Sequence, residues 1–243
     1  EAVLVGDGSG PVVTATGGAL VLSGVTLTGG VGLHSAPTPT LAARARGAGV
    51  YAADAESLTI RHCTFRDMVS ESAVGLLAPI AGQLIVEDTT FTNLESTAGS
   101  AVLSAYGSSA LLERVEVVDN IGSVVDDAGP TVWLQTSIAE VRESHFQGNS
   151  GQAVEASARA LGGGLALAAD FASLWNLTIE DNAADLGGGL WIQAVESTMS
   201  DVVMRGNTAR VDGGGLAIQR RLEDAPQHVT ITTTSDETGE TFT

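Results

Sequence analysis

Apolar residues recur at fixed positions in eight short segments of the chain, which align without gaps. In each segment the third position is apolar, the sixth is apolar or small in the first seven, and the eighth is apolar in all but the last. The fourth and fifth positions carry most of the charge. This alternation predicts β-strands with one buried face, and the 3.6-residue period of a helix is absent. The segments are 20–27, 58–65, 84–91, 110–117, 139–146, 172–179, 197–204 and, less regularly, 229–236.

Like residues occupy like positions in successive segments, which predicts that the segments stack on one another. The third position holds Leu22, Ile60, Val86, Leu112, Val141, Leu174, Met199 and Ile231. The eighth holds Leu27, Phe65, Phe91, Val117, Phe146, Ile179 and Met204 before failing at Asp236. A second short strand is expected in each repeat, with its outward column at Tyr51, Gly75, Leu103, Trp133, Ala166, Trp191 and Ala217.

Short strands at a constant period predict a parallel β-helix, in which each turn buries its apolar face against the next. The segments lie about 25 to 38 residues apart, too few for a four-stranded propeller blade. A sandwich would not keep the columns in register. At about 4.8 Å per strand, eight turns give a rod of roughly 35 to 40 Å.

Two segments share one phrase: Asn182–Ile192 reads NAADLGGGLWI and Asn207–Ile218 reads NTARVDGGGLAI. The glycines are expected at the corner that leads into the second strand, where a side chain is not tolerated or φ is positive. The asparagine also recurs at Asn120 and Asn149, three residues after each strand anchor. Because amides of consecutive turns can bond to one another and to turn backbone, these four asparagines predict a structural ladder.

These repeats resemble those of bacterial parallel β-helix proteins. FQGN at 146–149, IEDN, MRGN and the GGAL or GGGL corners are similar to the FxxN and GGA[ILV] repeats of chlamydial polymorphic outer-membrane proteins. The resemblance covers nearly the whole chain and implies the right-handed solenoid of the pectin-lyase-like superfamily. The chain departs from it after Phe65 and Phe91, which are followed by RDM and TNL without asparagine at the third place.

Charge and composition exclude several classes of function. The net charge of −18 over 243 residues disfavours binding to nucleic acid or to an anionic membrane surface, since both need a basic patch. No apolar run is long enough to span a membrane. The single cysteine, Cys63, excludes an internal disulfide and lies in an inward column as a buried thiol. Four scattered histidines show no metal spacing, and we expect no metal and no cofactor.

Charged side chains of neighbouring segments are expected to meet on the outer surface. The alignment pairs Arg61 with Glu87, His62 with Asp88, Asp88 with Arg114, Arg114 with Glu143, and Glu113 with Arg142. This predicts a solvated lattice of ion pairs, each worth about 0 to 1 kcal/mol. The alternative is a catalytic set formed by Glu87, Asp88, Glu113 and Arg114, because glycosidases use paired carboxylates. The resemblance implies a basic residue as general base in a lyase, yet the chain has no lysine.

An aromatic column offers the best ligand-binding hypothesis. Tyr51, Trp133 and Trp191 are expected to point outward, with the two tryptophans two turns and roughly 10 Å apart. Exposed rings at that spacing suit an extended glycan. The competing interpretation is that segments 28–57 and 150–162 cover them.

We therefore expect residues 1–243 to form one β-helix domain of a longer surface protein, with further chain or a partner covering each end. The expected function is a non-enzymatic extracellular or bacterial cell-surface scaffold or adhesin, whose partners are carbohydrate or other surface proteins. The alternatives are a secreted polysaccharide lyase or glycoside hydrolase and a structural subunit of a larger surface assembly.

Overall fold

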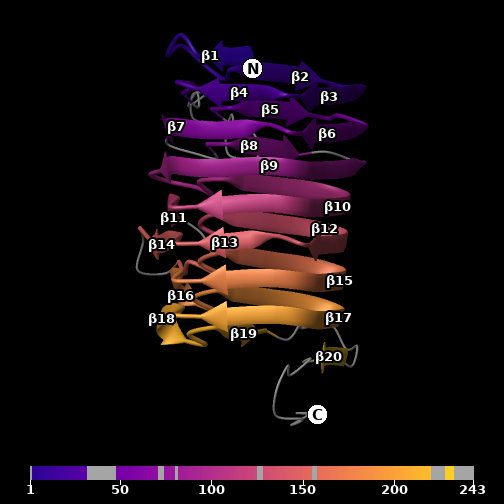
Figure 1. Ribbon diagram of the computed structural model, residues 1–243, viewed down its shortest axis with the longest axis vertical. Coiled ribbons are helices and arrows are strands. Elements are labelled where there is room, and N and C mark those ends of the chain that lie inside the picture. Colours follow the sequence, from indigo (N-terminus) through magenta and orange to yellow (C-terminus); the bar gives the residue numbers. More distant parts are fainter. Residues whose placement is uncertain are drawn as a thin grey trace.

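The computed structural model describes residues 2–31, 48–70, 74–79, 82–124, 128–154, 158–219 and 228–232. These residues form strands and no helix. The strands lie one below another along a single axis, from β1 beside the N-terminus to β20 (Figure 1). All pairings between the named strands are parallel, as in Ile60 with Val86 and Val86 with Leu112. The fold is a parallel β-solenoid of about seven turns, which confirms the expected class with about one turn fewer than expected.

Long strands bend around the solenoid in the middle turns. They are β9 (Gln83–Ser96), β10 (Leu103–Val118), β12 (Val132–Arg142), β15 (Leu165–Glu180) and β17 (Leu190–Arg205). Shorter strands complete the turns. They are β1 (Ala2–Val5), β2 (Val13–Thr16), β3 (Ala19–Ser23), β4 (Val25–Thr28), β5 (Val50–Ala53), β6 (Ser57–Arg61), β7 (Thr64–Ser70), β8 (Leu76–Pro79), β11 (Ile121–Val124), β13 (His145–Gln147), β14 (Ser150–Ala153), β16 (Ala183–Leu186), β18 (Thr208–Asp212), β19 (Leu216–Ile218) and β20 (His228–Thr232).

The core consists of columns of like residues, as the sequence predicts. Ile60, Val86 and Leu112 occupy one column and are at most 1% exposed. In the neighbouring column Phe65 stacks on Phe91, with ring centroids 4.7 Å apart. The last member of the first column, Ile231, pairs with Met199 but is 48% exposed, because the described residues place no strand on its other side. Asp236 lies outside the described residues.

A bend in left-handed conformation follows the fourth position of each of the first seven segments. The fifth position has a positive φ in His62, Asp88, Arg114, Glu143, Asn176 and Asp201, and in Gly24. The inward hydroxyls beside this bend are fully engaged: Ser144 Oγ donates to the Arg142 carbonyl and accepts the Val115 N–H of the preceding turn. Thr89 makes the same two bonds two repeats earlier. Polar residues therefore enter the sixth column because they satisfy the backbone of the corner.

The register of the second strand differs from our prediction in two turns. We expected Gly75 and Leu103 in the outward column, but the structure pairs Tyr51 with Leu77 and Trp133 with Ser104. Leu103 points inward and is 1% exposed. A Cβ on Gly75 would lie 2.4 Å from the Val102 carbonyl oxygen, so Gly75 is a corner residue and not a strand residue.

Cys63 is confirmed as a buried thiol. It is 2% exposed, and its Sγ lies 3.2 Å from the Arg61 carbonyl oxygen.

Candidate functional site

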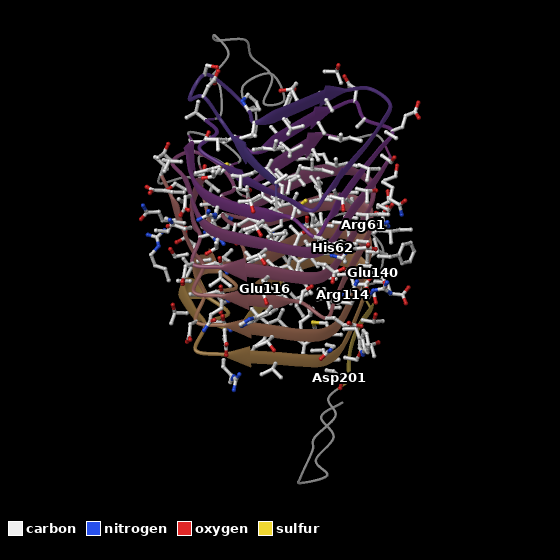
Figure 2. The ribbon with its side chains drawn as sticks, turned by 45° about the horizontal axis from the view of Figure 1, so that its top comes forward. Arg61, His62, Arg114, Glu116, Glu140 and Asp201 are labelled. Carbon is white, nitrogen blue, oxygen red and sulfur yellow. The ribbon has the colours of Figure 1, made fainter. Side chains whose placement is uncertain are left out.

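The proposed catalytic residues lie on an outer face that carries charges along several turns. Figure 2 shows Arg61, His62, Arg114, Glu140 and Asp201 spread along this face in the direction of the axis. All five expected pairs are present: Arg61–Glu87 at 2.7 Å, His62–Asp88 at 3.7 Å, Arg114–Asp88 at 2.6 Å, Arg114–Glu143 at 4.0 Å and Arg142–Glu113 at 2.6 Å. Arg114 also contacts Glu113.

These ion pairs oppose the chemistry that a catalytic acid needs. The hydrogen bonds from Arg114 hold the pKa of the Asp88 carboxyl below its ordinary value. Arg142, and then Arg114, lower the pKa of Glu113 in the same way. A general acid needs a raised pKa to remain protonated near neutral pH. The arrangement therefore favours carboxylates that are charged near neutral pH and held in a lattice.

The described residues show neither a metal site nor a membrane-spanning helix. They contain no group of three or more His, Cys, Asp or Glu side chains placed to hold a metal ion. They also contain no apolar helix of the length needed to cross a bilayer.

The asparagine ladder is present and buried. Asn120, Asn149 and Asn182 are 0% exposed, and each Nδ2 donates to Oδ1 of the next asparagine at 2.9 to 3.0 Å, ending at Asn207. Each Oδ1 from Asn149 onward also accepts the backbone N–H of the preceding asparagine. Above the ladder, the Leu94 N–H donates to Asn120 Oδ1. The ladder is thus a structural element of the core edge.

The aromatic column does not form the exposed surface that we expected. Trp133 and Trp191 are 8% and 3% exposed and pack with Leu161 and Ala166 in a small outer cluster. Their ring centroids are 5.8 Å apart, because small Ala166 occupies the turn between them and lets the rings meet. Tyr51 lies three strand pairings away from Trp133 and is half-buried. The prediction that the tryptophans present a stacking platform is wrong.

The chain itself covers the tryptophans as it returns toward each second strand. Leu161 and Leu186 belong to or flank the cluster and directly precede glycine runs. Gly162 has a φ of 65°, and a Cβ there would lie 2.0 Å from the Leu165 carbonyl oxygen and 3.0 Å from the backbone nitrogen of Trp191. Only glycine lets the backbone pass this close to the outer face of the strand. The covering interpretation is therefore correct for the part of segment 150–162 that contains Leu161.

Fluorescence quenching tests this placement. The chain has three tryptophans, and Trp175, the one outside this cluster, is 44% exposed. We expect acrylamide to quench part of the wild-type emission, and Trp175→Phe to leave a blue-shifted emission that acrylamide quenches weakly. Equal quenching of the two proteins would contradict the burial of Trp133 and Trp191.

A buried carboxylate ties three segments beside this cluster. Asp185 is 2% exposed, accepts the Ala160 N–H at 3.0 Å, and pairs with Arg210 Nε at 2.7 Å. Burial raises the pKa of Asp185, but the bonds from Arg210 and Ala160 outweigh it and leave this pKa below its ordinary value. Folding therefore favours the charged form of this carboxyl.

The pH dependence of stability follows from that sign. Because the pKa of Asp185 is lower in the folded than in the unfolded state, its contribution is complete well above about pH 4 and is lost as the pH falls through the folded value. We expect Asp185→Asn to reduce the free energy of unfolding by about 1 to 2 kcal/mol at pH 7, and this difference to shrink on acidification. Urea unfolding from pH 7 to pH 3 measures it, with exposed Asp119→Asn as the control. A difference that stayed constant with pH would contradict this role.

A second exposed surface was not predicted from the sequence. Tyr106, Ile138, Phe171 and Trp175 are 41 to 52% exposed on the outer faces of β10, β12 and β15. Beside Tyr106, Ile138 and Phe171 lies a depression of about 250 Å³ that touches four consecutive turns. Trp175 appears in an outward sequence column, but Phe171 lies just before the aligned segment and carried no signal there.

A second, shallow depression lies near His145, whose Nε2 is 3.1 Å from Glu180 Oε1. Arg205 also pairs with Glu180, at 3.0 Å. This group continues the pattern of charge pairing between turns and shares its carboxylate with a permanent cation.

No protein-family model, curated protein or solved structure matches the chain.

Proposed function

We propose that this chain is a non-enzymatic scaffold of the cell surface or extracellular space, which presents its outer faces as a rigid binding surface. The observation that carries the proposal is that arginines pair with the three carboxylates of the alternative catalytic set. Asp88 and Glu113 are held by arginines that lower their pKa values, and Glu87 is held by Arg61. Groups fixed in this way stabilise charge and position, and they are poorly suited to exchange protons.

The regular stack supports the same proposal. Columns in register give a rod in which each turn braces its neighbours, so side chains on the outer face keep fixed spacings. A surface of this kind suits display or adhesion better than a site that must close around a substrate.

The placement at a bacterial surface rests on the resemblance of the FQGN, IEDN, MRGN and GGGL repeats to chlamydial outer-membrane repeats. The strongly acidic composition, with a net charge of −18, is compatible with a place on a bacterial surface and disfavours nucleic-acid partners.

An activity screen tests the proposal. The purified protein is incubated with a panel of acidic and neutral polysaccharides, and reducing ends and unsaturated products are measured. We expect no turnover by the wild type, Glu87→Ala or Glu113→Ala. Turnover by the wild type that either folded variant abolishes would overturn the scaffold proposal and favour a lyase or hydrolase.

A further inference from the structure

The depression beside the exposed aromatic residues has the features of a binding groove. It runs across four neighbouring turns, from Gly107 to Gln193, which corresponds to three strand spacings or about 14 Å along the axis. Two small residues, Gly107 and Ala168, leave space between the larger polar side chains. We name this feature the polar groove.

The polar groove offers hydrogen-bonding groups of several kinds. Gln135 and Gln193 supply amides, which both donate and accept, Ser137 supplies a hydroxyl, and Asp170 supplies a carboxylate. A few converging polar groups in a concave surface are typical of sites that fix the orientation of a ligand.

Exposed rings flank the polar groove on two sides. Tyr106 is 41% exposed, pairs in register with Gln135, and stands beside Gly107 in the first of the four turns. Phe171 is 52% exposed and directly follows Asp170. On the same strand Trp175 faces outward about 14 Å further along. Aromatic side chains of this kind offer a large apolar face that a ligand can cover.

The backbone around the polar groove cannot bind an added strand. β12 pairs with β10 on one side and with β15 on the other, and β15 pairs in turn with β17. An extended peptide is usually recognised through the unpaired backbone of a sheet edge. A ligand here must instead be recognised by side chains.

The charge of the groove disfavours one class of ligand, the acidic polymers. Among the lining residues that the structure describes none is cationic, Asp170 lines the groove, and Glu196 pairs with the neighbouring Phe171. An acidic polymer would be repelled, because it needs arginine or lysine to neutralise it. Side-chain amides, a hydroxyl and a carboxylate beside aromatic faces suit a chain rich in hydroxyl groups and free of negative charge.

We propose that the polar groove, with Tyr106 and Phe171 at its flanks, binds a neutral glycan chain that lies along the axis of the solenoid. This inference rests on the proposed surface function and specifies the ligand of that surface. Hydroxyl groups of the sugars bond to Gln135, Asp170 and Gln193, and the apolar faces of the sugar rings pack on the two aromatic side chains.

Affinity electrophoresis tests the assignment with named probes. The native protein is run through gels that contain dextran, laminarin, yeast mannan, xyloglucan or hydroxyethyl cellulose as neutral glycans, and polygalacturonate as the acidic one. We expect at least one neutral glycan to retard the protein and polygalacturonate to leave its mobility unchanged. Phe171→Ala and Gln135→Ala should each raise the dissociation constant of the retarding glycan about tenfold.

Val203→Ala is the matched control, because Val203 is 45% exposed outside the polar groove and its replacement should leave the affinity unchanged. Circular dichroism and the melting temperature check that each variant is folded. No retardation by any of the neutral glycans, or retardation that both groove variants retain, would overturn the proposal. If no glycan binds, and peptides selected from a displayed library bind the wild type but not Phe171→Ala, the groove would be reassigned to a peptide ligand.

The outcomes separate this inference from the proposed function. Binding followed by cleavage of a neutral glycan would contradict the scaffold proposal and support the ligand class. Absence of both binding and turnover would contradict only the ligand class.

Discussion

Replacing Asn149 with alanine should lower the free energy of unfolding by about 3 to 5 kcal/mol. The Asn149 side chain donates to the Val117 carbonyl at 2.8 Å and to Asn182 Oδ1 at 3.0 Å. Its own Oδ1 accepts both the backbone N–H and Nδ2 of Asn120. Since the side chain is 0% exposed, water cannot replace these bonds, and each orphaned group costs about 1 to 3 kcal/mol.

Asn207→Ala provides the matched control, because Asn207 ends the ladder and is only half-buried. Its loss orphans fewer groups, so we expect about 1 to 2 kcal/mol. Urea unfolding followed by circular dichroism measures both variants. If Asn149→Ala cost no more than Asn207→Ala, the ladder would not be the cooperative buried network described here.

Replacing Phe91 with alanine should cost about 3 to 5 kcal/mol. Phe91 is 1% exposed, stacks on Phe65 at 4.7 Å, and contacts the corner at Gly75. Truncation leaves a cavity inside a stack whose turns are fixed by strand pairing on both sides, so the surroundings cannot collapse to fill it.

The same substitution at an exposed phenylalanine isolates the effect of burial. Phe171 is 52% exposed, and Phe171→Ala should change the free energy of unfolding by no more than about 0.5 kcal/mol. Thermal and urea unfolding of the two variants give the comparison. Similar losses at both positions would mean that the eighth column does not form the core.

The sequence predicted the stacking because register leaves little freedom in a strand with one buried face. A slip of one residue would turn Ile60, Val86 and Leu112 toward water. Once these residues are aligned, outward neighbours such as Arg61 and Glu87 must meet, and they do so at 2.7 Å. The ion-pair lattice could therefore be predicted residue by residue.

The second strand was harder to predict where alternation fails. In turns three and four apolar residues follow one another, in Leu76–Leu77 and Val102–Leu103. Both registers then have apolar residues facing inward, so the pattern does not choose between them. The position of the corner decides, and the close approach of Gly75 to the Val102 carbonyl is a property of the three-dimensional path.

The candidate site could not be predicted because it depends on segments between the aligned strands. Burial of Trp191 is produced by the chain passing over it, and the apolar residue before each glycine run, Leu161 or Leu186, was the available signal. The polar groove lies where the pairing of β12 with β15 is interrupted at Ser137 and Asp170. A bend of this kind breaks the two-residue period, so no column in the sequence records it.

Distances between paired spin labels test the central claim most directly, which is that the turns stack coaxially and in register. Thr59, Ile85, Leu111, Glu140, Ser173 and Thr198 form one outward column through successive pairings. In a Cys63→Ser background, labels at positions 59 and 173 should lie about 19 Å apart and labels at 59 and 198 about 24 Å apart. Narrow distributions that lengthen by about 5 Å for the added turn would agree with the solenoid. Broad distributions, or distances that do not increase with the number of turns, would contradict it.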